Sequence, residues 1–231
     1  MTAPPDTPKL RQAIIDACRW MNDRGLNQGT SGNISMRAGA GMIITPTAIP
    51  YAAMKPDMLV ALPLEGDPAA GQKPSSEWRF HQKLLATRPD MAAVVHAHPP
   101  YCSVLAVQRK AIPACHYMVA AFGGNDVPLA GYALYGSGAL AEDVATTMRN
   151  RHGCLMANHG ATVVGETLER GLWRLEELEV LARTYFLSNL GGQSALLTDA
   201  EIDQVRDSFQ DYGPGQLGGQ KPTKADQEKD R

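Results

Sequence analysis

The residues of this chain best suited to chemistry are two histidines at the end of an apolar run. His96 and His98 follow the segment "AAVV" and stand immediately before Pro99. The run predicts a buried strand, and side chains two residues apart on a strand project to the same face. The two imidazoles are therefore expected to lie close enough to hold one cation. Taken alone, such a pair is more commonly explained by two core histidines with separate hydrogen bonds.

A third histidine favours the metal-binding interpretation over the two separate core histidines. His159 lies in "MANHGATVV", again where a short apolar segment meets a glycine. Three histidines at strand ends resemble an open catalytic zinc site, in which three protein ligands leave one position for a substrate. The other histidines, His81, His116 and His152, lack this placement, and His152 is expected at the surface beside Arg151.

A general acid or base is the next requirement, and "KPSSEWRFH" offers Glu77 at the start of a predicted helix. Ser75, Ser76 and Glu77 are also the residue types that cap a helix and suit its dipole, and this segment alone favours that interpretation. The alternative is a phosphate held by the hydroxyls and free N–H groups, with Glu77 turned towards a metal. Two further loops, "GTSGNISMR" and "ITPTAIPY", could bind an anion through their backbone, but neither is a Walker A or Rossmann fingerprint.

The composition narrows the class of protein. The chain has 231 residues, 44% of them hydrophobic, and a net charge of −2, so it can bury a core but has no basic surface for nucleic acid. No run approaches 18 apolar residues and no signal peptide precedes the first helix, so we expect a soluble cytoplasmic protein without a membrane partner. The widely spaced cysteines are expected to be reduced, buried thiols: Cys18, Cys102, Cys115 and Cys154.

The elements that must position these groups alternate along the chain. Periodicity and capping residues predict helices over residues 8–24, 75–88, 101–108, 137–151, 168–189 and 199–211. Extended segments are predicted over residues 33–37, 41–45, 57–62, 92–98, 129–135, 154–158 and 161–165. This alternation indicates a layered α/β domain. It predicts a flexible N-terminus over residues 1–8, a folded domain over 9–212 and a disordered tail over 213–231, and leaves the strand pairing open.

Taken together, the segments resemble the class II aldolase/adducin family. "GTSGNIS", "ITPT", "PSSEWRFH", "HAHP", "HYMVAAFGGNDVP" and "NHG" occur in that family's order and spacing, from about residue 13 to residue 212. The subgroup that is most similar contains zinc-dependent ketose-1-phosphate aldolases such as L-fuculose-1-phosphate aldolase. The resemblance implies a three-layer α/β/α fold with a central, largely antiparallel sheet. It also implies a C4 homotetramer with active sites between subunits, and Zn²⁺ as cofactor with Mn²⁺ or Co²⁺ as alternatives.

The resemblance assigns a role to each matching position. His96, His98 and His159 match the zinc ligands, and Glu77 matches both the acid/base and a fourth ligand of the resting site. The positions that match the phosphate grip are Asn33, Thr47, Ala48, Ser75 and Ser76. Tyr117 matches a proton donor supplied across the subunit interface. Aromatic residues near the aldehyde end of the substrate are expected at Tyr135, Phe209 and Tyr212.

One position departs from the family pattern. The family usually has glycine after "TPT", where this chain has Ala48. Its backbone N–H can bind phosphate in the same way only if φ is negative or if strain is tolerated.

The implied activity is reversible cleavage of a ketose 1-phosphate to dihydroxyacetone phosphate and an aldehyde. Fuculose 1-phosphate, 5-deoxyribulose 1-phosphate and 5-(methylthio)ribulose 1-phosphate all fit, and the last two would place the enzyme in nucleoside salvage. One alternative is a sugar-phosphate 4-epimerase of the L-ribulose-5-phosphate type, although such enzymes tend to carry Asp at the position of Glu77. Another is a non-catalytic adducin-like interaction domain, which lacks the metal site whose histidines this chain retains.

Overall fold

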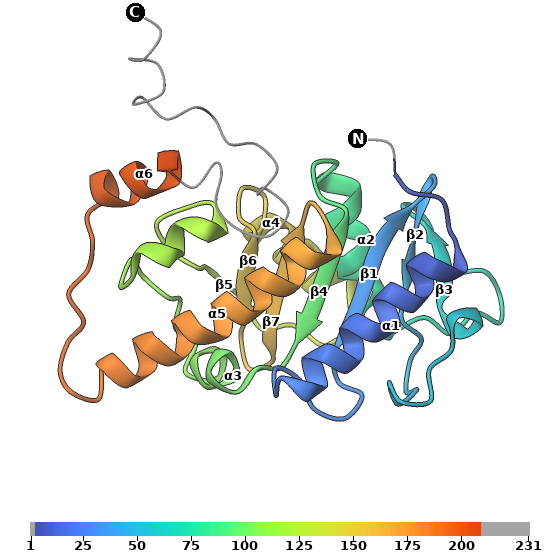
Figure 1. Cartoon of the computed structure of the whole chain (residues 1–231), viewed down its shortest axis with the longest axis horizontal. Helices are drawn as coiled ribbons and strands as arrows, with labels where there is room; N and C mark the ends of the chain where they lie inside the picture. Colours follow the sequence, from blue (N-terminus) through green and yellow to red (C-terminus); the bar gives the residue numbers. More distant parts are fainter. Residues whose placement is uncertain (1–2, 209–231) are drawn as a thin grey trace, which may run out of the picture.

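The core of the protein is a seven-stranded mixed sheet (Figure 1), seen in a computed structural model that describes residues 3–208. The strands are β1 (Asn33–Ala38), β2 (Gly41–Ile44), β3 (Val60–Pro63), β4 (Ala93–Ala97), β5 (Leu129–Ala130), β6 (Gly153–Met156) and β7 (Gly160–Gly165). Their order in the sheet is β3-β2-β1-β4-β7-β6-β5. Every neighbouring pair is antiparallel except β5 and β6, which are parallel. The predicted largely antiparallel sheet is confirmed.

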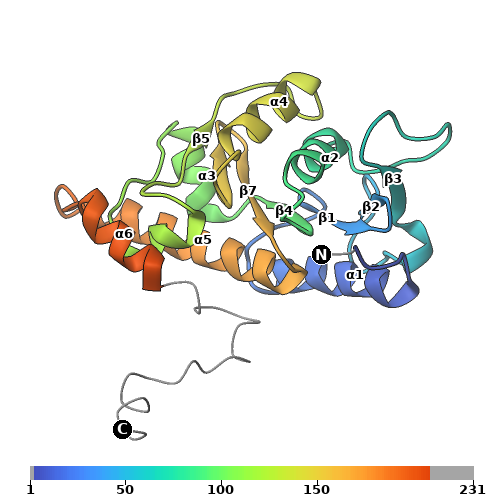
Figure 2. The same ribbon diagram turned by 90° about the horizontal axis from the view of Figure 1, so that it is seen from above.

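Helices cover both faces of this sheet, which gives the three layers that the sequence predicts. The α-helices are α1 (Pro8–Asp23), α2 (Trp78–Thr87), α3 (Pro100–Val107), α4 (Gly138–Thr147), α5 (Leu168–Ser188) and α6 (Asp199–Ser208), with 3-10 turns η1 (Pro56–Met58) and η2 (Tyr117–Phe122). Figure 2 shows α1 and α5 along one face and α2 and α4 along the other. No helix in the described part of the chain is long and apolar enough to cross a membrane.

Strand β4 lies at the centre of the sheet and is buried on both faces. Val95 packs in the cluster formed with α1 and α5, whereas Val94 packs in the cluster formed with α2 and α4. Both side chains are fully buried, and each contributes about 1.5–3 kcal/mol through burial. Because the side-chain period of a strand is two, His96 shares the face of Val94 and looks towards α2.

Most predicted elements are present, but the segment over residues 129–135 is not a long strand. Only Leu129 and Ala130 pair with β6. Beyond them Tyr132, Leu134 and Tyr135 are 64%, 65% and 65% exposed. Neither face of a longer strand would be buried here, so the aromatic pattern that predicted one reflects a surface loop instead. The first three residues of the segment predicted over 57–62 likewise form a turn before β3.

The ends of the folded region are anchored by specific contacts. Thr7 caps α1 by accepting a hydrogen bond from the N–H of Leu10, and the carbonyl of Pro4 accepts one from the N–H of Gly39. The four cysteines are free thiols, three of them buried. The predicted division at residues 8 and 212 stays a prediction, and residues 209–231, with Phe209 and Tyr212, lie outside the described residues.

A close backbone approach joins β7 to α5, and it yields a test of the fold. A Cβ added at Gly165 would collide with the carbonyl of Thr167 and the N–H of Gly171, and would lie 2.8 Å from the Cα of Gly171. We expect Gly165→Ala to lower the free energy of unfolding by about 1–3 kcal/mol through overpacking, measured by urea denaturation. Gly138→Ala is the control, because a Cβ there meets nothing within 4 Å. Equal midpoints for the two variants would contradict this packing.

Candidate active site

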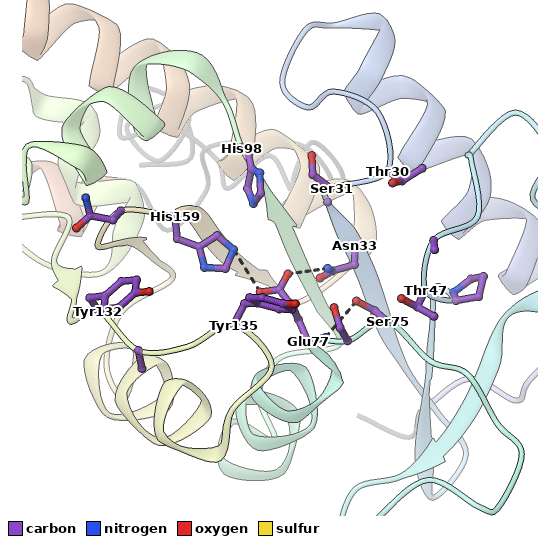
Figure 3. A pocket seen from close by; sticks show the side chains of 16 residues that line it. Thr30, Ser31, Asn33, Thr47, Ser75, Glu77, His98, Tyr132, Tyr135 and His159 are labelled. Carbon is purple, nitrogen blue, oxygen red and sulfur yellow. Dashed lines mark hydrogen bonds and ion pairs between the residues drawn. The ribbon is translucent and has the colours of Figure 1, made fainter.

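A pocket of about 470 Å³ lies at the ends of β1 and β4 and beside the connection between β6 and β7 (Figure 3). It is lined by Thr30, Ser31, Gly32, Asn33, Pro46, Thr47, Ala48, Ser75, Ser76, Glu77, His98, Tyr132, Ala133, Tyr135, Asn158 and His159. The lining therefore combines the predicted phosphate-binding loops with three of the four predicted metal ligands, namely Glu77, His98 and His159. All five residues predicted to grip phosphate are among the lining residues, although their role stays a prediction.

The three predicted histidines converge. His96, His98 and His159 each offer a ring nitrogen, and these nitrogens lie within 4.8 Å of one another. The Nε2 atoms of His96 and His98 are 3.1 Å apart. His96 is fully buried, whereas the other two rings are partly exposed towards the pocket. Three ligands gathered on one side, with an open side facing a pocket, are typical of a catalytic rather than a structural metal site.

The orientation of His96 is set by its neighbour strand. Its Nδ1 atom is 2.9 Å from the carbonyl oxygen of Ala161 and 3.2 Å from the Oγ1 of Thr162 on β7. A carbonyl can only accept a hydrogen bond, so Nδ1 carries the proton and the lone pair is on Nε2. This lone pair faces the cluster, and a second hydrogen bond of this kind is how proteins orient a metal-binding imidazole.

His159 is aimed by the tight connection between β6 and β7. Asn158 adopts a left-handed conformation with φ of 55°, which asparagine tolerates better than most residues. A Cβ on the following Gly160 would lie 2.6 Å from both the carbonyl oxygen of Ala97 and the Cδ2 of His98. The glycine of the "NHG" motif is thus needed for the close approach of the two histidine-bearing segments.

Glu77 precedes the first residue of α2 but does not cap the helix, contrary to what this segment alone favoured. Its Oε2 is 3.1 Å from Nε2 of His96 and accepts a hydrogen bond of 3.0 Å from the Asn33 amide. Its Oε1 lies 3.3 Å from Nε2 of His159, yet it is buried and accepts no hydrogen bond. Figure 3 shows the carboxylate between His159 and Asn33.

The charge state of the cluster suits a cation. Burial alone would raise the pKa of Glu77, but the imidazoles of His96 and His159 and the Asn33 amide together lower it well below its usual range. Burial, followed by repulsion from His96, lowers the pKa of His98 to about 3 and that of His159 to about 4. An ionised, buried carboxylate with an unpaired oxygen therefore faces imidazoles whose lone pairs are available. Nitrogen and oxygen donors of this kind fit a divalent ion such as Zn²⁺.

A chain of buried hydrogen bonds supports Glu77 from behind. The Nε2 of His81 is 2.5 Å from the Oδ1 of Asn33, and its Nδ1 is 2.8 Å from the Oγ of Ser35. Because Asn33 donates to Glu77 through its Nδ2, its Oδ1 must accept, so His81 donates from Nε2 and accepts from Ser35. Burial lowers the pKa of His81 to about 3, so the ring is neutral as this pattern requires.

His81 was missed by the sequence analysis, which placed no function on it. The signal was present in "EWRFH", because residues four apart share one face of a helix. The predicted surface position of His152 is wrong as well, since this ring is partly buried in a second pocket. Tyr132, which also lines the first pocket, lay in a segment that was predicted to be strand.

The two loops that are predicted to bind phosphate are held side by side by backbone contacts. The N–H of Ser75 donates to the carbonyl of Thr45, and the N–H of Thr47 donates to that of Lys73. Ala48 has φ of 58°, so the strain foreseen from its departure from glycine is present. Left-handed backbone costs a residue with a Cβ about 1–2 kcal/mol.

The two described tyrosines that are expected near the substrate differ in whether they line the pocket. Tyr135 lines the pocket, but Tyr117 does not: it lies on η2 and is 45% exposed. A single chain therefore leaves Tyr117 outside its own pocket.

Comparison with known proteins decides the family. The model of the class II aldolase and adducin N-terminal domain matches residues 12–186. The chain belongs to this family. It is 42% identical over 204 residues to 5-methylthioribulose-1-phosphate/5-deoxyribulose-1-phosphate aldolase of Rhodospirillum rubrum, covering 88% of this chain and 92% of that protein.

Two further relatives are similar over most of their length. L-fuculose phosphate aldolase of Escherichia coli K12 is 43% identical over 206 residues, which cover 89% of this chain and 96% of that protein. A solved structure of L-fuculose 1-phosphate aldolase superposes with a TM-score of 0.84 at 34% identity, covering 88% of this chain and 97% of that one. Class II aldolases are metal-dependent enzymes, in agreement with the histidine cluster.

The hydrogen-bond chain behind Glu77 can be tested through stability. His81→Phe would leave the Oδ1 of Asn33 and the Oγ of Ser35 buried without a partner, so we expect a loss of about 1–3 kcal/mol for each orphaned group in urea denaturation. Ser35→Ala orphans one buried group, the Nδ1 of His81, so it should cost about 1–3 kcal/mol, roughly half the loss in His81→Phe. A His81→Phe protein that unfolds within about 0.5 kcal/mol of wild type would show that the chain does not hold Asn33.

Proposed function

We propose that the protein is a metal-dependent aldolase that reversibly cleaves a ketose 1-phosphate to dihydroxyacetone phosphate and an aldehyde. The observation that carries the proposal is Glu77, an ionised and buried carboxylate that faces three convergent histidines on one side of a pocket. The opposite wall of that pocket carries Thr47, Ser75 and Ser76 on two adjoining loops. The named activities of the relatives point to the same reaction.

The metal we propose is Zn²⁺, with Mn²⁺ or Co²⁺ as alternatives, held by His96, His98 and His159. When bound, such an ion acts as a Lewis acid and stabilises the negative charge of the enediolate that cleavage produces. Glu77 is the fourth ligand that we propose for the resting site, because its unpaired Oε1 faces the cluster.

Substrate orientation comes from the phosphate-binding loops. The hydroxyls of Thr47, Ser75 and Ser76, the Asn33 amide and the N–H of Ala48 line one side of the pocket, where they can hold a dianion without a charged side chain. Fixing the phosphate at C1 places C3 of the sugar near Glu77. Binding energy spent in this way serves orientation, which is worth several kcal/mol in catalysis.

Glu77 is the proton carrier at C3. In the cleavage direction the C3–C4 electron pair passes into the enediolate. Glu77, protonated from solvent for this step, delivers its proton to C3, which completes dihydroxyacetone phosphate and regenerates the carboxylate. In the synthetic direction the same carboxylate removes that proton. The low pKa of Glu77 keeps it ionised and ready to act as the base in the synthetic direction.

In the synthetic direction Tyr117 of a neighbouring subunit donates its phenol proton to the new C4 alkoxide, and in the cleavage direction the resulting phenolate takes up the proton of the C4 hydroxyl. Tyr117 is exposed and lies outside the pocket of its own chain, which supports a site completed by a second copy. We propose a C4 homotetramer, in which each subunit supplies this tyrosine to the next.

The aldehyde end of the substrate points towards Tyr135 at the mouth of the pocket, with Phe209 and Tyr212 proposed as additional contacts. We propose that the substrate is a fuculose, 5-deoxyribulose or 5-(methylthio)ribulose 1-phosphate. The last two would give the enzyme a cytoplasmic role in nucleoside salvage.

The role of Glu77 is tested by Glu77→Gln, which keeps the size of the side chain and removes its charge. We expect the metal content to stay at the wild-type level while exchange of the C3 proton of dihydroxyacetone phosphate with solvent falls by about 10²–10⁴-fold, as followed by NMR in D₂O. Glu142→Gln, an exposed change on α4, is the control. Exchange at the wild-type rate in Glu77→Gln would refute the role.

The reaction itself is tested by incubating the wild-type protein with the three candidate phosphates and assaying free dihydroxyacetone phosphate. An aldolase releases it together with an aldehyde. Formation of a C4 epimer without dihydroxyacetone phosphate would assign the protein to the epimerase alternative instead.

A further inference from the structure

A second pocket lies at the opposite ends of the strands that carry the histidine cluster. Asp90 precedes β4, His152 precedes β6 and Glu166 follows β7, and all three line this pocket. His96 and His159 lie at the other ends of β4 and β7. With a rise of about 3.3 Å per residue, these strands separate the two sites by roughly 15–20 Å. The second pocket is therefore distinct from the proposed active site.

The second pocket is strongly basic. It has a volume of about 670 Å³, and its charged lining consists of five arginines against two carboxylates. The arginines are Arg88, Arg149, Arg170, Arg174 and Arg206. The chain as a whole has a net charge of −2, so this concentration of positive charge is local.

Two of the arginines form ion pairs with the two carboxylates that line the pocket. Arg88 pairs with Asp90 at 2.7 Å and donates to the carbonyls of Met148 and Arg151 after α4. Arg174 pairs with Glu166 at 2.8 Å and donates to the carbonyl of Val164. Both guanidinium groups are buried and have a structural role, and Glu166 also interacts electrostatically with Arg170.

The other three arginines come from three different segments. Arg149 follows α4, is exposed, and forms no ion pair within residues 3–208. Arg170 is on α5 and stacks over Trp173 at 4.4 Å. Arg206 is on α6 and pairs with Asp203 at 2.9 Å, with both side chains exposed to solvent. Even with Asp203 counted, positive groups outnumber negative ones around the pocket.

Neighbouring groups respond to this excess of positive charge. Burial and then the charge of Arg174 lower the pKa of His152 to about 4, so this ring adds no further charge at neutral pH. Burial and Arg174 also lower the pKa of Arg170. A bound anion would relieve this repulsion, because guanidinium groups bind oxyanions through paired, charge-assisted hydrogen bonds.

We propose that this pocket is a binding site for a compact anion that carries two or more phosphate-type groups, held by Arg149, Arg170 and Arg206 above the buried Arg174. Its small, apolar lining residues are Ala120, Ala121 and Gly123, and no Phe, Tyr or Trp side chain among the described residues lines it. The ligand is therefore recognised by its charge, without a nucleobase contact. This site does not depend on the proposed aldolase reaction.

Isothermal titration calorimetry of the full chain with tripolyphosphate tests the proposal. We expect Arg149→Gln/Arg206→Gln to weaken this binding about tenfold or more, since each lost charge-assisted hydrogen bond is worth about a factor of ten. Lys9→Gln/Lys110→Gln removes the same charge from exposed positions outside the pocket and should bind as wild type. Sulfate at equal ionic strength should compete poorly, because it spans fewer arginines.

A third variant separates this site from the active-site phosphate grip. Thr47→Ala/Ser75→Ala should retain tripolyphosphate binding. The proposal is overturned if that variant loses all binding, or if Arg149→Gln/Arg206→Gln binds as tightly as wild type. It is also overturned if the wild-type protein binds no tripolyphosphate. If, in addition, the arginine variant changes oligomeric state by size-exclusion chromatography, a second copy of the chain occupies the pocket.

Discussion

A buried carboxylate without a full set of partners is the constraint on which the site depends. Removing an ionised carboxylate from water costs several kcal/mol unless opposite charge or hydrogen bonds replace the solvent. Glu77 has the Asn33 amide on one oxygen and no hydrogen bond on the other. Burial lowers the pKa of His98 and that of His159, so these two imidazoles carry no charge at neutral pH. A cation among those rings supplies the counter-charge that the polypeptide lacks, which is why the carboxylate and the histidines are best understood as one unit.

The antiparallel register of the sheet brings this unit together. Asn33 on β1 and Thr162 on β7 both pair with His96 on the central strand. Asn33 on β1 therefore orients Glu77, and Thr162 on β7 orients the ring of His96. A slip of one residue in either pairing would turn these side chains to the opposite face. The buried valines on both faces of β4 fix the register, so the packing of the core also determines the geometry of the site.

The sequence was informative where periodicity and spacing carry the signal. The apolar run in "AAVVHAH" predicted the strand, and the two-residue spacing predicted the shared direction of His96 and His98. The layered α/β class followed from the order of elements. The role of Glu77 was harder to predict from the sequence, because serine and glutamate at the start of a helix are more simply explained as capping residues. The direction of its side chain depends on where α2 packs against β4, which is a tertiary property.

Other features could not be predicted from the sequence because they also depend on tertiary contacts. The pairing of His81 with Asn33 joins residues 48 apart in the chain, and no local pattern encodes it. The segment after Ala130 has aromatic residues typical of a strand, yet it has no partner to bury them. The basic pocket combines an arginine that follows α4 with arginines on α5 and α6, and each looks like an ordinary solvated charge when its own segment is considered separately.

The central claim is that one divalent ion binds to His96, His98 and His159 with an open side. X-ray absorption spectroscopy on the zinc-loaded protein, with metal content measured per chain, tests this most directly. The account predicts one zinc per chain with three nitrogen ligands at about 2.0–2.1 Å, and loss of this signal in His98→Asn. A shell of four fixed protein ligands that substrate cannot alter, or unchanged zinc binding in His98→Asn, would contradict it.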